Sequence, residues 1–171
     1  MRHGFHPRLF ILCLLLSAVI SSAPILPVHA VMVHDEPNGF RGNHWGDAPG
    51  NCPSLRFVFG QGTTRTNKQV DLYDRSTVGI ILNGVTFSRI RYRFLDNQLE
   101  SVQLVYEGRE NRGKLLKLME QRYGALTPGE RKQLGGVEWE GFETVVNLSF
   151  NISTDQGSLW FISRDLAGGF N

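Results

Sequence analysis

Side chains that could bind a metal ion or transfer a proton are concentrated in one short stretch of the chain. They are His34, Asp35, Glu36, His44, Asp47 and Cys52. Imidazole, carboxylate and thiolate groups are common ligands of Zn²⁺ and common acids and bases of hydrolytic enzymes. Their spacing matches no closed zinc pattern, and histidines in a Gly-rich loop more often face water. The sequence therefore predicts no cofactor and no catalytic residue, and it leaves His34, His44 and Asp47 as weak metal candidates.

Three arginines indicate a second kind of chemistry. Arg89, Arg91 and Arg93 recur at every second position, so a strand would place all three on one face. Such a row could bind a carboxylate, a phosphate or an acidic glycan. The competing interpretation is internal pairing with carboxylates of a neighbouring strand, for which the candidates are Glu138, Glu140 and Glu143. We favour internal pairing, but we retain the three arginines as candidate ligand-binding residues.

The first thirty residues predict that the chain is exported. Residues 1–30 begin with two arginines, continue as an almost unbroken apolar run, and end with small residues around Ala30. This is the pattern of a signal peptide, with cleavage predicted after Ala30 and, as the second choice, after Ala23. The apolar run is shorter than the roughly 20 residues that a spanning helix needs. We expect residues 31–171 to form one domain, periplasmic or extracellular, with no stable membrane span after cleavage.

Loss of that segment changes both the charge and the cysteine content. The full chain has 18 Lys and Arg against 16 Asp and Glu, and removal of Arg2 and Arg8 leaves 16 of each. A neutral domain is a poor partner for a phosphate backbone, so we predict no nucleic-acid binding. Cys13 is removed as well, which leaves Cys52 without an internal disulfide partner. The remaining thiol could join two chains, which makes a dimer through Cys52 a possible assembly.

The elements that would position these residues begin with a hairpin. Apolar residues alternate with the arginines in its first strand and recur with the same period in its second: Ile90, Tyr92 and Phe94, then Val102, Leu104 and Tyr106. Pairing Ile90 with Leu104 and Tyr92 with Val102 keeps both apolar sets on one face of the sheet. It also predicts a three-residue loop at 96–98. The arginines then lie on the opposite face.

One main helix is expected to cover the apolar face of that hairpin. Asn111 is the expected N-cap of a helix over about residues 112–123, and Gly124 is the residue that ends it. Leu115, Leu118 or Met119, and Tyr123 fall on one side of this helix. We therefore expect that side to pack on the sheet.

Further strands are expected at Trp139, from Thr144 to Ile152, and from Ser158 to Ser163. The last of them is apolar on both sides, and we expect Trp160 to be buried rather than part of an exposed patch. The predicted fold class is α+β, an antiparallel β-sheet of about five to seven strands packed against one main helix. Residues 31–54 are expected to form an irregular N-terminal segment.

Within that segment, the phrase Phe40-Arg41-Gly42-Asn43-His44-Trp45-Gly46 combines two aromatic residues with glycines. It predicts a segment that turns sharply and plugs the edge of the core. Together with Tyr92 and Phe94, Tyr123-Gly124 and Trp139, this phrase resembles a loose group of small, uncharacterised, exported bacterial proteins. The resemblance implies a location in the bacterial envelope and carries over no catalytic residue. Trp45 is the aromatic candidate for contact with a ligand.

The apolar residues are accounted for by a core, and no cluster of reactive side chains is left over. We therefore predict a non-catalytic, exported binding or accessory module of the bacterial cell envelope, whose partner is an unknown protein or envelope ligand. The first alternative is a small secreted metal-dependent hydrolase that uses the loop from His34 to Asp47. The second is an inhibitor of a secreted enzyme, which would use the polar stretch 60–68 or the arginine row.

Overall fold

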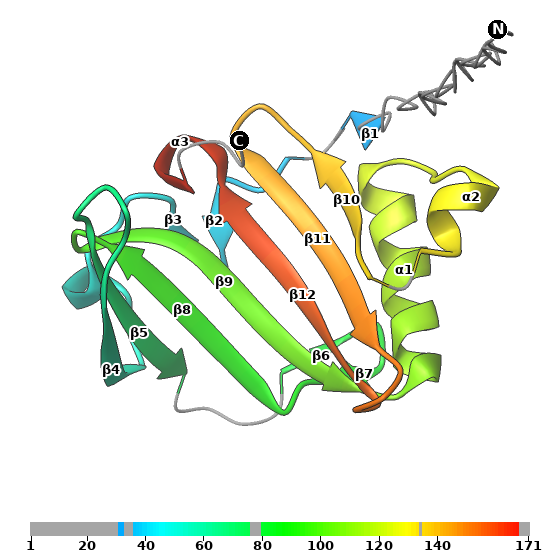
Figure 1. The fold of residues 1–171 in the computed structure, drawn as a ribbon, viewed down its shortest axis with the longest axis horizontal. Coiled ribbons are helices and arrows are strands. Elements are labelled where there is room, and N and C mark those ends of the chain that lie inside the picture. The colour runs from blue at the N-terminus through cyan, green and yellow to red at the C-terminus, as the bar shows by residue number, and fades with distance from the viewer. Residues whose placement is uncertain (1–30, 33–35, 76–79, 134, 168–171) are drawn as a thin grey trace, which may run out of the picture.

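The computed structural model describes residues 31–32, 36–75, 80–133 and 135–167. Its framework is one eight-stranded sheet in the order β1-β10-β11-β12-β9-β8-β5-β4 (Figure 1). The strands are β1 (Val31–Met32), β4 (Leu55–Thr63), β5 (Gln69–Arg75), β8 (Arg89–Leu95), β9 (Gln98–Glu107), β10 (Val137–Glu140), β11 (Thr144–Asn151) and β12 (Gln156–Ser163). All neighbours are antiparallel except β1 and β10. The predicted α+β class is confirmed, because an antiparallel sheet packs against one main helix. Strand β1 adds one parallel strand at the end of this sheet.

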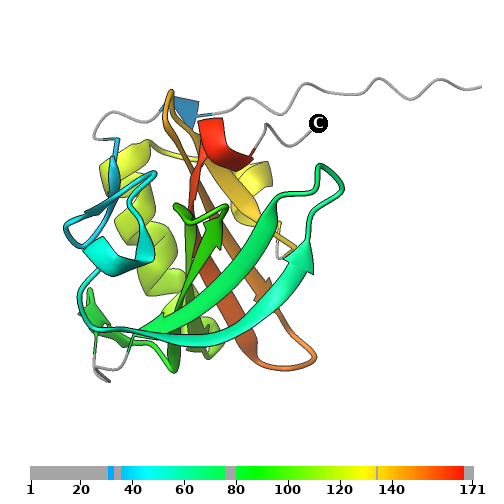
Figure 2. The same ribbon diagram turned by 90° about the vertical axis from the view of Figure 1, so that its left-hand side faces the viewer.

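The other elements are short hairpins and helices. They are β2 (Gly39–Phe40), β3 (Asn43–His44), the 3₁₀ turn η1 (Pro49–Asn51), β6 (Ile81–Leu82), β7 (Val85–Thr86), α1 (Arg109–Tyr123), α2 (Pro128–Arg131) and α3 (Arg164–Ala167). In Figure 2, α1 and the segment with β2, β3 and η1 lie on one side of the sheet. The tip of the β4–β5 hairpin projects towards the other side. We call these two sides the helix face and the outer face.

The β8–β9 hairpin has the expected register but a different turn. Ile90 pairs with Leu104, as predicted from the alternation. The predicted three-residue loop is wrong, because the turn holds only Asp96 and Asn97, whose φ angles of 47° and 63° are those of a type I′ turn. The register shifts after Arg93 because Glu100 is an extra residue in β9. This β-bulge allows a two-residue turn and the expected pairing to occur together.

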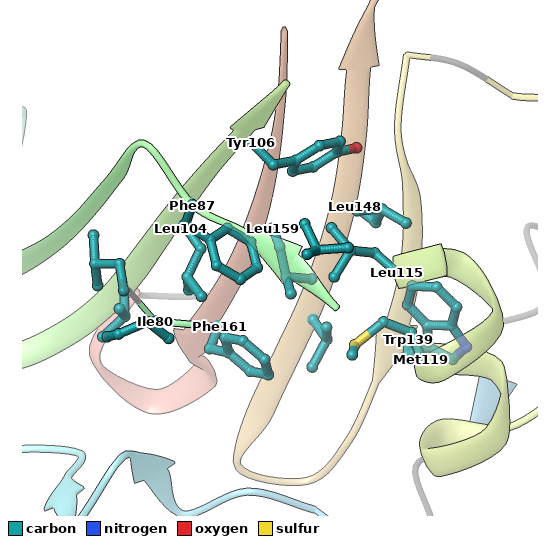
Figure 3. Packing of buried hydrophobic residues seen from close by; sticks show 14 of the residues in the cluster. Ile80, Phe87, Leu104, Tyr106, Leu115, Met119, Trp139, Leu148, Leu159 and Phe161 are labelled. Atoms are coloured by element: carbon teal, nitrogen blue, oxygen red, sulfur yellow. The ribbon is translucent and has the colours of Figure 1, made fainter. Parts of the chain in front are cut away.

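The core lies between the helix face of the sheet and α1. The even-numbered residues of β8, and those of β9 from Val102 onward, are buried there, and Tyr92, Leu104 and Tyr106 are each 0 % exposed. Leu115, Met119 and Tyr123 of α1 are buried against them in the same cluster, as Figure 3 shows for the first two. The sheet also contributes Trp139, Val146, Leu148, Leu159 and Phe161. The alternation of the sequence thus decides which face of each strand the helix covers.

Helix α1 begins earlier than the sequence predicts. It starts at Arg109, directly after Gly108, whose φ of 86° turns the chain out of β9. Asn111 is therefore not the N-cap: it lies in the first turn and donates from Nδ2 to the carbonyl oxygen of Glu107 at 2.8 Å. The predicted end is confirmed, because Gly124 follows the last helical residue with a φ of 113°.

Strand β4 is long and exposed, and it includes part of the polar stretch 60–68. It continues to Thr63, and only 64–68 connect it to β5. Its pairing with β5 shifts register twice, between Phe57 and Phe59 and between Gly60 and Gly62. The stretch 60–68 is therefore the end of the β4–β5 hairpin and not a separate projecting loop. Strand β4 forms one edge of the sheet.

A truncation in α1 tests whether this helix provides much of the core. Met119 is 1 % exposed and packs in the main cluster, so Met119→Ala should leave a cavity and destabilise the fold by about 2–5 kcal/mol. Lys117→Ala, at an exposed position of the same helix, should change the free energy of unfolding by less than about 0.5 kcal/mol. Urea denaturation measures both. Equal effects of the two changes would show that α1 is not packed as described.

Candidate functional site

The N-terminal cluster of potential metal ligands is not assembled into a site. His34 and Asp35 lie outside the described residues. His44 is exposed, and its Nδ1 lies 3.8 Å from Oδ2 of Asp47, which accepts a hydrogen bond from the His44 backbone N–H at 2.7 Å. Glu36 points towards the loop between β10 and β11. Among the described residues, no three His, Cys, Asp or Glu side chains lie close enough to hold a metal ion together.

Glu36 binds the loop between β10 and β11. Its carboxylate accepts hydrogen bonds from the backbone N–H groups of Phe142, Glu143 and Thr144. A carboxylate that satisfies several N–H groups of one turn holds that turn in a single conformation. Glu36 therefore ties the N-terminal segment to the sheet, and it is not available for acid-base chemistry.

Trp45, the aromatic candidate for ligand contact, also has a structural role. Its Nε1 donates to Oγ1 of Thr144 at 2.7 Å, and its ring packs against the main core. Phe40 belongs to the same phrase, and its ring contacts that of Phe161, with 5.3 Å between the ring centroids. Arg41 and Gly42 turn the chain between them, with φ angles of 54° and 80°. The predicted plug is present, but Trp45 is part of it and is a poor candidate for ligand contact.

The arginine row is divided by internal pairing. Arg91 donates from Nε and Nη2 to the two carboxylate oxygens of Asp74, at 2.8 and 3.1 Å, and these hydrogen bonds raise the pKa of Arg91. Nη1 of Arg93 lies 2.6 Å from Oε2 of Glu100. Arg89 is exposed, and no described residue forms an ion pair with it.

The partners of the arginines differ from the expected Glu138, Glu140 and Glu143. Strand β8 lies between β5 and β9, whereas β10 is separated from it by β11, β12 and β9. Cross-strand pairs form only between neighbouring strands, so the carboxylates of β5 and β9 are the ones within reach. The charges of Arg91 and Arg93 are therefore already compensated by carboxylates, and little of the positive charge of the arginine row remains to bind an anion.

Cys52 lies in the core rather than on the surface. It is 4 % exposed and belongs to the same cluster as Tyr92. Burial raises the pKa of the Cys52 thiol, and the nearby charge of Asp47 raises it further. A thiol in this position is both inaccessible and mostly protonated. The structure therefore argues against a catalytic nucleophile and against a dimer through Cys52.

A row of polar side chains crosses the outer face of the sheet. Direct cross-strand partners follow one another in the order Glu138, Asn147, Trp160, Gln103, Arg91 and Asp74. Neighbouring strands lie about 4.8 Å apart, so the five steps of this transverse row span roughly 24 Å. Each residue comes from a different strand. The row therefore exists only because β10, β11, β12, β9, β8 and β5 are aligned in this register.

The transverse row has a closed half and an open half. In the closed half, Arg91 and Asp74 satisfy each other. In the open half, no described residue hydrogen-bonds to the side chains of Glu138, Asn147 and Trp160. Gln103, between the two halves, donates from Nε2 to Oγ of Ser158 at 2.9 Å and keeps its carbonyl oxygen free of any bond to the described residues. The open half is thus a set of unpaired polar groups that faces a cavity.

That cavity is about 400 Å³, within the range of small-ligand sites. It is lined by Arg93, Glu100, Ser101, Glu138, Asn147, Trp160 and Ile162. The bulge turns the Glu100 side chain into its floor, where Oε2 accepts from Ser101 Oγ at 2.6 Å as well as pairing with Arg93. A second cavity of about 290 Å³, under the tip of the β4–β5 hairpin, is lined by the same ion pair. The ion pair of Arg93 and Glu100 therefore lines both cavities.

The three tryptophans show which part of the fold is left open. Nε1 of Trp45 donates to Thr144 at 2.7 Å, and Nε1 of Trp139 donates to the carbonyl oxygen of Gly124 at 2.9 Å. Within the described part of the chain, Nε1 of Trp160 has no acceptor. Buried indole N–H groups usually find one. Trp160 is only half-buried and lines the cavity, so the expectation that it is buried is wrong.

The sequence interpretation missed this site because its residues are far apart in the chain. Asn147 and Trp160 are placed side by side by the β11–β12 hairpin, and Gln103 reaches Trp160 only because β9 lies beside β12. One sequence feature indicated the site. Trp160 lies on the same face of β12 as Ser158, next to the polar residues of β11. An aromatic residue among polar ones on a solvated face is typical of a binding surface.

Comparison of the chain with protein-family models, curated proteins and solved structures finds no match. Among the residues that the structure describes, no helix combines the length and the apolar character needed to cross a bilayer.

The buried thiol provides a direct test of the N-terminal packing. Because the pKa of Cys52 is raised, its thiolate fraction in mildly alkaline solution is lower than that of an ordinary cysteine, whose pKa is about 8.5. Ellman's reagent should react with the native protein at least about tenfold more slowly than with the protein unfolded in guanidinium. A non-reducing gel should show a monomer. Rapid labelling of the native protein, or a dimer that reductant dissociates, would contradict the burial of Cys52.

Proposed function

We propose that this chain is a non-catalytic, exported binding module of the bacterial cell envelope, and that its ligand occupies the cavity on the outer face. The open half of the transverse row carries the proposal. Glu138, Asn147 and Trp160 offer a carboxylate, an amide and an indole N–H to one cavity, and no described residue hydrogen-bonds to them. Polar groups arranged in this way can exchange hydrogen bonds with water for hydrogen bonds with a ligand.

The positions of the reactive side chains support a binding role rather than a catalytic one. Glu36 binds backbone N–H groups, Cys52 is buried, and His44 and Asp47 lie at the surface away from the outer face. A general acid or base must reach the reacting group within hydrogen-bond distance. In the described residues these groups do not converge on either outer-face cavity, whose carboxylates are Glu100, already paired, and Glu138.

Export to the envelope is supported by the sequence. Residues 1–30, which lie outside the described residues, have the basic, apolar and small-residue order of a signal peptide. The resemblance to small exported bacterial proteins points to the same compartment. The fold contains one remaining cysteine in its core and depends on apolar packing. Such a domain needs no disulfide to be stable after export.

Fractionation of the source cells tests export and binding together. The mature protein should begin at Val31 and sediment with the envelope fraction. Trp160→Ala should be exported to the same extent but should remain mostly in the soluble fraction, because its truncation removes the aromatic contact at the centre of the row. Phe142→Ala is the matched control: Phe142 is also aromatic, is 80 % exposed, and lies in the β10–β11 loop.

Three results would contradict the proposal. The first is a full-length chain retained in the cytoplasm. The second is sedimentation of Trp160→Ala like that of the unaltered protein. The third is turnover of a substrate by the purified protein, which would contradict the non-catalytic part alone.

A further inference from the structure

The composition of the outer-face cavity indicates what it binds. Its lining combines one large aromatic ring, an amide, a hydroxyl and two carboxylates with a single arginine. The arginine is neutralised by Glu100, which is 4 % exposed, and the remaining carboxylate, Glu138, belongs to an exposed residue. An exposed charge is screened by water and salt. Charge is therefore not the basis of recognition at this cavity, and an anion would meet Glu138 without a free cation.

The position of the cavity argues against an extended peptide. Peptides that bind sheets usually add a strand to an edge, where backbone N–H and C=O groups are free. The open half of the row lies on β10, β11 and β12. Asn147 and Trp160 are each paired on both sides, whereas β1 covers β10 only beside Trp139 and Glu140. The backbone groups of β11 and β12 at the row are therefore already engaged in the sheet. Recognition here must therefore use the side chains, and these are an indole with amide and carboxylate neighbours.

We propose that the open half of the transverse row binds an uncharged polysaccharide chain, an inference that rests on the proposed binding function. A sugar ring has an apolar C–H face that packs on an aromatic ring and hydroxyl groups around its rim. Trp160 offers the aromatic ring, and the side chains of Asn147, Gln103 and Glu138 offer donors and acceptors on both sides of it. An amide can both donate hydrogen bonds to sugar hydroxyls and accept them, and a carboxylate can accept them.

The length of the open half favours a chain over a single sugar. From Glu138 to Trp160 the open half takes two steps between strands, or roughly 10 Å, and Gln103 extends it by one step to roughly 14 Å. This is longer than one sugar ring. The polysaccharide would run across the strands, with one unit over Trp160 and its neighbours over Asn147 and Gln103. The ion pair of Arg91 and Asp74 ends the row, because each partner compensates the charge of the other through two hydrogen bonds.

Titration of the purified mature protein with oligosaccharides of one length tests this inference. The uncharged probes are the tetramers of N-acetylglucosamine and of glucose, and the charged probes are the tetramers of glucosamine and of galacturonate. Calorimetry should show binding of at least one uncharged tetramer, accompanied by a change in tryptophan emission. A higher salt concentration should change this affinity by less than about twofold, because no charge is neutralised.

Variants of the row should weaken the same titration. Trp160→Ala should reduce the affinity by at least about tenfold, and Asn147→Ala by about threefold to tenfold. Glu107→Gln is the control, because Glu107 is an exposed carboxylate at the end of β9 and does not line the cavity. It should bind like the unaltered protein. Asn147→Ala removes only a half-buried amide, so it keeps the test valid if Trp160→Ala fails to fold.

The inference is overturned if no uncharged tetramer binds at about millimolar concentration, if only charged tetramers bind, or if both row variants bind like the unaltered protein. Failure of the uncharged probes, with envelope sedimentation still dependent on Trp160, would show that the ligand is not an uncharged glycan and would leave the proposed function standing. Sedimentation that does not depend on Trp160 would remove the proposed function itself.

Discussion

The register of the antiparallel strands is the constraint on which both faces of this protein depend. In β9 and β12, Leu104 and Leu159 face the core, while Gln103 and Trp160 lie side by side on the outer face, where Trp160 lines the cavity. Because side chains alternate between the faces, a shift of one residue would exchange the two sets. The apolar packing against α1 therefore also aligns the polar row on the outer face. Core and candidate site are consequences of the same pairing.

The N-terminal segment explains why its reactive residues do not form an active site. The side chains of Glu36 and Trp45 bind the turn after β10 and Thr144 of β11, and the main-chain carbonyl of Asp47 accepts from the backbone N–H of Leu99 in β9. These contacts hold the segment against the helix face. A polar residue that satisfies buried backbone groups stabilises the fold because those groups would otherwise be unpaired.

Local patterns predicted the parts of the fold that depend on residues close in the chain. The pairing of Ile90 with Leu104 and the buried side of α1 follow from alternation and helical spacing. The pairing of Arg91 with Asp74 was not predicted, because the sequence does not reveal that β5 is the neighbour of β8. The bulge at Glu100 leaves only one mark in the sequence, a change of the apolar core positions from odd at Leu99 to even from Val102 onward. A prediction of the transverse row through Trp160 would need the strand order, the pairing register and the position of the bulge together.

Hydrogen exchange of the three indole N–H groups, followed by NMR, tests the central claim directly. Trp45 and Trp139 donate their N–H groups within the fold, whereas the Trp160 N–H has no acceptor among the described residues. Two indole signals should therefore exchange slowly, and one, absent in Trp160→Phe, should exchange quickly. Addition of a ligand that occupies the outer-face cavity should slow that third signal. A slowly exchanging Trp160 N–H in the free protein would contradict the open row and the site built on it.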